Sequence, residues 1–143
     1  MRKIAKFLRL RTADQLFLAS CLITVGLVRL GLTVLSYRFV RRWLVRATAE
    51  ESASPGELNR LAWGVGQASR LVPGATCLTQ ALSGQILLSR LGKASRIRVG
   101  VSSSGPGRIE AHAWLVSGDH IVLGGTEKSL QRYNRLAEFG TDA

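Results

Sequence analysis

The chain has 143 residues and a formal net charge of +11 at neutral pH. This length fits one domain, long enough to bury a core of its own, with an appended helical arm. Only two cysteines and two histidines are present, scattered along the chain, so we expect no zinc site, no disulfide scaffold and no cofactor. This cysteine usage predicts a reducing, cytoplasmic compartment.

The basic excess lies at the N-terminal end. Residues 1–50 hold ten Lys and Arg residues against two acids, whereas residues 51–143 hold ten against seven. Such an excess implies an anionic partner, which is a membrane surface, a nucleic acid or an acidic peptide. Nucleic acid is not expected, because aromatic content is low in this part and no nucleic-acid-binding motif appears. We therefore divide the chain into a helical arm, residues 1–50, and a domain, residues 51–143.

The arm contains an apolar run. Residues 12–15 have the form of a capping box, which predicts a helix that begins at Ala13. Residues 16–37 are long enough to cross a bilayer, but Arg29 lies in the middle of the run and basic residues flank both ends. We favour a helix or helical hairpin packed on the domain, or lying against a membrane surface or a partner, over a spanning helix. No small-residue cleavage site follows, so a secretory signal is not expected, and Cys21 is interpreted as a packing residue.

Two helices are predicted at the start of the domain. Ser54 is a natural N-cap followed by proline at the first helical position, and Glu57 completes a capping box, so the first helix should run to about Leu71. A Pro-Gly turn separates it from the second helix, which Thr76 caps and which ends at Leu91 before a glycine. The second helix is apolar on most sides, which is typical of a central helix.

After residue 92 the hydrophobic period changes from 3.6 to 2. We predict antiparallel strands at 96–101, 108–116 and 120–123, and a short terminal helix or packed tail at 129–139. The second strand has two faces, one with Ile109, Ala111, Ala113 and Leu115 and the other with Glu110, His112, Trp114 and Val116. Two helices followed by an antiparallel meander predict an α+β domain.

Cys77 and His112 are the residues that suggest chemistry. Cys77 falls in the first turn of the second predicted helix, where unpaired N–H groups and the helix dipole favour a thiolate. A sheet packed on that helix can bring His112 within reach, which gives the nucleophile and base of a cysteine acyl-transfer enzyme. The alternative is that Cys77 is a small buried hydrophobe and His112 a structural histidine. Trp114 would be a cleft wall or core, and His120, at a turn, is interpreted as structural or solvated.

The cysteine-bearing helix, residues 91–101 and the segment 110–115 with its His-Ala-Trp sequence together resemble the transglutaminase-like, papain-related core. More narrowly, they are similar to the leader peptidases of lasso-peptide biosynthesis, the stand-alone B-protein protease domain of the microcin-processing family. The resemblance covers about residues 55–140, and the apolar, basic arm is also similar. It implies an α+β fold in which a central cysteine-bearing helix packs on an antiparallel sheet.

The resemblance also implies an activity and its partners. Cys77 would attack the peptide bond that joins leader to core in a precursor peptide, and His112 would take the thiol proton and return it to the leaving amine. The leader would be presented by a separate recognition protein, since no recognition domain is evident here, and a lasso cyclase would act next. No metal or cofactor is implied.

The family's third catalytic residue, an aspartate on the strand after the histidine, has no counterpart at the expected position near Gly124. The residue opposite His112 is residue 123, 124 or 125, depending on the turn, and none is a carboxylate. Asp119 lies several residues along the strand, Glu110 is one pleat repeat away, and residues 126–127 reach back only from a bulged strand. A Cys–His dyad, or a triad completed by a backbone carbonyl, would fit.

Two other functions stay open. The same pair of residues could transfer an acyl group to an amine, as in a transglutaminase. The chain could also be a non-catalytic basic adaptor, tethered to a membrane or a peptide through residues 1–50. The missing carboxylate opposite His112 is the best support for an adaptor.

Overall fold

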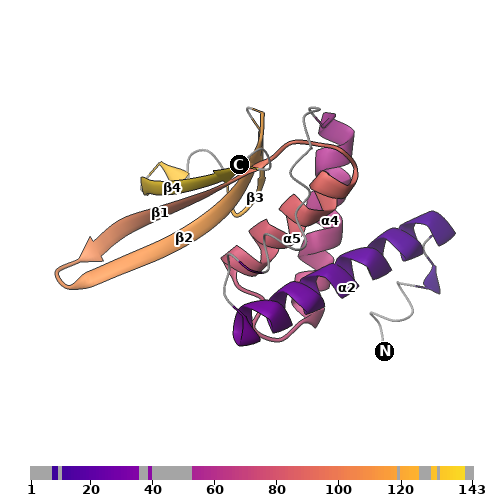
Figure 1. Cartoon of the computed structure of the whole chain (residues 1–143), viewed down its shortest axis with the longest axis horizontal. Helices are drawn as coiled ribbons and strands as arrows, with labels where there is room; N and C mark the ends of the chain where they lie inside the picture. The colour runs from indigo at the N-terminus through magenta and orange to yellow at the C-terminus, as the bar shows by residue number, and fades with distance from the viewer. Residues whose placement is uncertain are drawn as a thin grey trace.

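A computed structural model describes residues 8–9, 11–35, 39, 53–118, 120–125, 130–131 and 133–140, with backbone only at 103–105, 135–137 and 139–140. The described elements are helices α2 (Thr12–Val34), α4 (Pro55–Leu71) and α5 (Cys77–Arg90), and strands β1 (Arg96–Gly105), β2 (Arg108–Ser117), β3 (His120–Leu123) and β4 (Asn134–Gly140) (Figure 1). Helices followed by strands confirm the predicted α+β fold.

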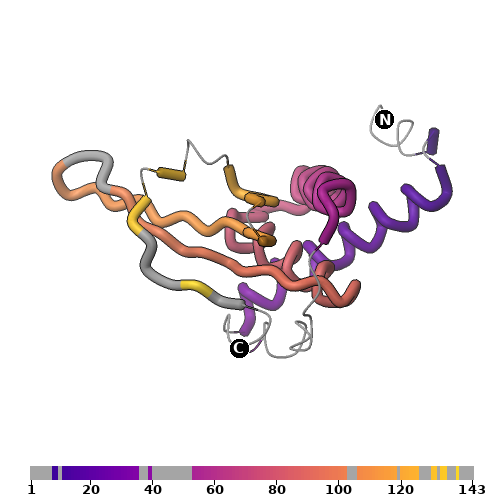
Figure 2. The backbone as a smooth tube through the Cα atoms, turned by 90° about the horizontal axis from the view of Figure 1, so that it is seen from above, coloured from indigo at the N-terminus to yellow at the C-terminus, as the bar shows by residue number. Residues whose placement is uncertain are grey.

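The strands form one antiparallel sheet in the order β3-β2-β1-β4. The β1–β2 hairpin is long, and its tip extends away from the three helices (Figures 1 and 2). The prediction of a terminal helix or tail at 129–139 is wrong for the C-terminal part of that segment, because residues 134–140 form β4 and pair with β1. Without β4, β1 would be an edge strand with a row of unpaired backbone groups.

The start of α4 has the predicted capping box. The Ser54 hydroxyl accepts a hydrogen bond from the Glu57 N–H at 3.2 Å, and the Glu57 carboxylate accepts one from the Ser54 N–H at 3.2 Å. Hydrogen bonding to Ser54 lowers the pKa of Glu57. The larger effect comes from the Ser54 backbone N–H and the smaller one from the Ser54 side chain. The carboxylate therefore stabilises the folded chain above the pH range in which an unfolded glutamate titrates.

This box gives a pH-dependent prediction. Ser54→Ala should lower the free energy of unfolding by about 1 kcal/mol. Glu57→Ala should lower the melting temperature at pH 7, but this loss should shrink once the pH falls below the lowered pKa of the folded-state carboxylate, where the wild-type group is protonated. Thermal unfolding followed by circular dichroism measures both variants. The Ser54→Ala loss should depend on pH less strongly, because the Ser54 side chain is only the second cause of the lowered pKa of Glu57. A pH-independent loss for Glu57→Ala would contradict the prediction.

Helix α2 packs on α4 and α5. It begins at Thr12 with Arg11 as N-cap, and that cap has no side-chain hydrogen bond, so the predicted capping box is not formed and the helix starts one residue early. At Gly64 of α4, an added Cβ would lie 2.6 Å from Phe17 Cε1 and 2.7 Å from Cys21 Sγ. Only glycine lets the two helices approach this closely. The prediction that the arm's helix packs on the domain is confirmed for α2, while the boundary predicted between residues 50 and 51 lies outside the described residues.

Helix α5 is the centre of the core, as predicted. Its apolar side chains pack with those of α2, α4 and one face of the sheet; the fully buried members include Val25, Val28, Leu61, Val65, Leu82, Ile86, Ile97 and Leu115. Even its polar positions Thr79 and Ser83 are buried. At Gly84 an added Cβ would lie 2.6 Å from Leu115 Cδ2, so this glycine sets the close packing of α5 on β2.

Candidate active site

Cys77 is the first residue of α5. The Thr76 hydroxyl caps the helix by accepting a hydrogen bond from the Thr79 N–H at 3.3 Å. The N–H groups of Cys77 and Leu78, also in the first turn, have no carbonyl four residues back within the helix to which they could donate. The Cys77 side chain is half-buried and lies at the positive end of the helix dipole. The predicted placement of the cysteine at a helix N-terminus is confirmed.

Arg29 of α2 lies against the turn that leads to Cys77. A Cβ added at Gly74 would lie 2.7 Å from Arg29 Nε and 2.8 Å from Nη2. The guanidinium donates a hydrogen bond to the Thr33 hydroxyl, whereas Nε is buried and has no partner among the described residues. Sequence reasoning took Arg29 only as an obstacle to membrane insertion. Its signal was a single charge within an apolar helix, which indicates a charge turned toward the protein.

His112 is held by a backbone carbonyl. Its Nε2 lies 2.5 Å from the carbonyl oxygen of Gly124. A carbonyl oxygen only accepts hydrogen bonds, so Nε2 carries a proton and Nδ1 is the ring nitrogen left to accept one. Of the alternatives left open by the sequence, the structure has the one in which His112 donates its hydrogen bond to a backbone carbonyl.

Gly124 also explains the missing aspartate. Its φ is +102°, and an added Cβ would lie 2.7 Å from Trp114 Cβ and 2.9 Å from the carbonyl oxygen of Ala113. No side chain fits at this position, since the backbone of residue 124 lies directly against β2. The pair of glycines after the third strand was the sequence signal for this close approach.

Two aromatic rings hold the imidazole plane. The His112 ring stacks on Tyr133, with 5.3 Å between ring centroids, and on Trp114, at 6.2 Å, with interplanar angles of 26° and 21°. Gly100 faces His112 across the β1–β2 pair, and an added Cβ there would lie 3.0 Å from both Trp114 and Tyr133. Trp114 is buried beside the histidine, which agrees with its interpretation as core. Tyr133 was missed because its segment was predicted to be a tail.

Cys77 and His112 lie in separate settings. Alternation along β2 directs Ala113 into the core against α5 and turns His112 to the opposite face, as predicted for the two faces of this strand. The hydrogen bond and ring contacts of His112 described above do not include Cys77. No contact between Cys77 and His112 is among those described for either side chain. Their catalytic pairing therefore stays a prediction.

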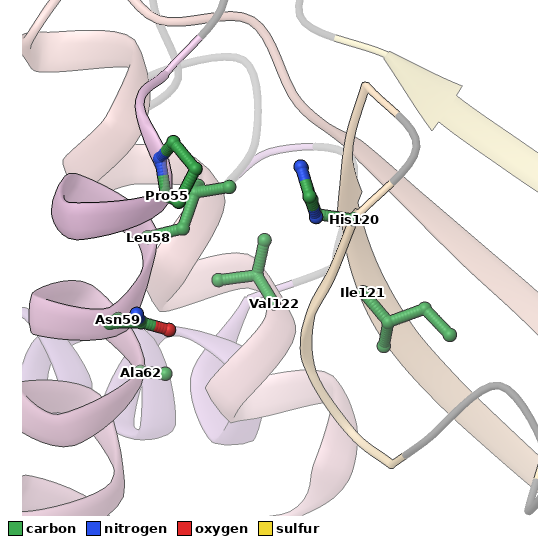
Figure 3. Close-up of a pocket in the computed structure, with 7 residues that line it drawn as sticks. All are labelled: Pro55, Leu58, Asn59, Ala62, His120, Ile121 and Val122. Atoms are coloured by element: carbon green, nitrogen blue, oxygen red, sulfur yellow. The ribbon is translucent and has the colours of Figure 1, made fainter.

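The other titratable candidates lie apart. His120 is exposed, as interpreted from its turn position, and lines a pocket of about 100 Å³ between α4 and β3 that contains neither Cys77 nor His112 (Figure 3). Asp119 and residues 126–127 fall outside the described part of the chain. Within that part, no group of three or more His, Cys, Asp or Glu side chains could hold a metal ion.

The two thiols should differ in reactivity. Cys21 is fully buried between α2 and α4, and burial raises the pKa of its thiol to about 11, a shift that Arg60 opposes. At pH 8 we expect iodoacetamide to modify one thiol in the native chain, Cys77, and both thiols after denaturation. Intact-mass spectrometry measures this, with Cys77→Ala as the control that should add no label. Two additions to the native chain would show that α2 does not protect Cys21.

The sequence matches the family model described as the transglutaminase-like superfamily over residues 21–138. No curated protein and no solved structure matches the chain. The match begins within α2 and ends within β4, so it includes Cys77, His112 and the strands that position the histidine.

Proposed function

The chain belongs to the transglutaminase-like superfamily, which includes cysteine peptidases and acyltransferases, and on this premise we propose that it is a cysteine peptidase. Its substrate is the precursor of a lasso-type, ribosomally made peptide, from which it removes the leader. The resemblance of residues 55–140 to the leader peptidases supports this narrower assignment. The peptidase acts in the cytoplasm, with the leader presented by a separate recognition protein and with a lasso cyclase acting on the freed core.

The proposed reaction uses the described residues in two steps. His112 Nδ1 takes the proton of the Cys77 thiol, and the sulfur attacks the carbonyl carbon that joins leader to core. The oxyanion that forms is stabilised by the Cys77 N–H and the positive end of α5. The C–N bond breaks as His112 returns the proton to the leaving amine, which leaves a thioester. Water, deprotonated by His112, then hydrolyses the thioester and frees the leader.

The observation that carries the proposal is the hydrogen bond between His112 and the Gly124 carbonyl. It fixes the proton on Nε2 and presents Nδ1 as the basic nitrogen, which is the task of the third residue in a catalytic triad. Closure of the pair is part of the proposal. His112 lies on the face of β2 turned away from α5, so Cys77 and His112 come within hydrogen-bond reach only when precursor binding rearranges this part of the sheet against α5.

Incubation of the chain with a precursor peptide and its recognition protein tests this function. We expect mass spectrometry to detect free leader and free core, with one water added across the cleaved bond. His120→Ala is a control that should cleave normally, because His120 is outside the site. Incorporation of an added primary amine without net hydrolysis would select the acyltransferase instead. The absence of both products from a folded chain would favour the adaptor, which the separation of Cys77 from His112 supports.

A further inference from the structure

The side of α2 that faces away from α4 and α5 is apolar and exposed. We call the following residues the α2 stripe: Leu16, Ile23, Leu27, Leu30 and Val34, each between 54% and 71% exposed. Their spacings of three, four and seven residues place all five on one line along the helix. Exposed Ser20 lies on this line between Leu16 and Ile23, and the other four residues, from Ile23 to Val34, follow one another without a polar residue. An apolar surface of this length marks an interaction site, unlike single exposed apolar residues.

The charges of α2 lie on its other side. Asp14 forms an ion pair with Arg60 of α4, with 2.8 Å between Oδ1 and Nη1. Arg29 packs against Gly74 in the turn before α5. Both charged residues of the helix therefore face the protein, and the α2 stripe carries no charge along its whole length.

The ends of the stripe are basic. Arg9 and Arg11 are exposed immediately before the helix, and residues 36–50 add four arginines against one acid. This charge argues against a second copy of the chain as the occupant, because two strongly basic arms would then lie against each other. A line of leucine, isoleucine and valine between two basic ends fits the boundary between the acyl chains and the headgroups of an anionic membrane.

We propose that α2 docks the protein on an anionic lipid membrane, with its axis along the surface and the α2 stripe among the acyl chains. The helix is long and apolar enough to cross a bilayer. However, it contacts the domain along its length, at Arg60 near its start, at Gly64 and at Gly74. Spanning would break these contacts, whereas a surface position keeps all of them. The sequence analysis expected residues 1–50 to contact a membrane surface or another anionic partner. The proposal assigns this contact to a membrane and to one face of α2.

Vesicle flotation with the full chain tests the proposal. The vesicles contain phosphatidylcholine alone or phosphatidylcholine mixed with phosphatidylglycerol. We expect the wild type to float with the mixed vesicles, and its binding to fall as salt is raised from about 50 to about 500 mM. Replacing Ile23, Leu27 and Leu30 together by serine should weaken binding about tenfold or more. Ile109→Ser is the matched control, because Ile109 is 77% exposed but lies on β2, and it should bind like the wild type.

Several results would overturn the proposal. One is equal binding by the wild type and the triple-serine variant, and another is no binding to mixed vesicles. A lipid-free dimer that the triple-serine variant abolishes would show that a second copy covers the stripe. Bound protein that resists both high salt and carbonate would show a spanning helix. Protection of Cys21 from iodoacetamide verifies that α2 stays docked in each variant. None of these readouts uses Cys77 or His112, so they are independent of the proposed peptidase activity.

Discussion

Replacement of Cys77 by alanine is expected to abolish release of the leader, with a fall in kcat of about 10³-fold or more. The reason is that no other described side chain at the N-terminus of α5 can form the thioester. The measurement is the initial rate of leader release by mass spectrometry, with precursor and recognition protein held at fixed concentrations.

The control for this prediction is the second thiol. Cys21→Ala removes a thiol that is buried between α2 and α4, and this variant should keep its peptidase activity because Cys21 lies in the core. Leader release by Cys77→Ala at the wild-type rate would remove Cys77 from the mechanism and the peptidase assignment with it.

The second large effect is expected at Gly124. Gly124→Asp places a carboxyl group near the position at which the resemblance implies an aspartate, yet it should damage the site rather than complete it. The positive φ and the 2.7 Å approach of a Cβ to Trp114 Cβ force the backbone of residue 124 away from β2, which displaces the carbonyl that holds His112. We expect a loss of about 1–3 kcal/mol in the free energy of unfolding and a fall in peptidase activity of about tenfold or more.

Gly107→Asp separates backbone strain from the effect on His112. Gly107 also has a positive φ, +76°, but a Cβ there meets nothing within 4 Å, and it lies in the turn of the β1–β2 hairpin. This control should lose stability but retain activity. Denaturant unfolding and leader release measure the two effects for both variants. Full or raised activity in Gly124→Asp would mean that the carbonyl of residue 124 does not position the histidine.

The fold was predictable where local signals and burial agree. The Ser54 cap and the glutamate three residues later define the start of α4 in sequence and structure alike. On β2, alternation assigned Ala113 and Leu115 to one face and Trp114 to the other before any packing was known. These patterns are local, and tertiary contacts reinforce them rather than compete with them.

The failures involve contacts between distant segments. Residues 134–140 have no clean period of two, and they become a strand because β1 offers them an edge. At the start of α2, one more helical residue placed Thr12 inside the first turn, where it cannot act as N-cap. Both outcomes depend on neighbours that a local pattern does not report.

The sequence predicted the candidate residues of the site, but it did not predict the neighbouring groups that position them. Cys77 at the helix N-terminus followed from the cap at Thr76. The carbonyl that holds His112 was one of several alternatives, because the turn length decides which residue lies opposite the histidine. The position of Arg29 beside Gly74 depends on how α2 docks on the domain, and no spacing within the sequence contains that information.

The central claim, that Cys77 and His112 act as a coupled pair, is tested most directly by the pH dependence of Cys77 alkylation. Iodoacetamide rates are measured for the wild type and His112→Ala, with and without leader peptide and recognition protein. Cys21 contributes little at neutral pH because the pKa of its buried thiol is about 11. With leader peptide and recognition protein present, we predict that the wild type keeps a larger share of its alkylation rate than His112→Ala does as the pH is lowered toward neutrality. The profile of an ordinary thiol, identical in both proteins under both conditions, would contradict the account.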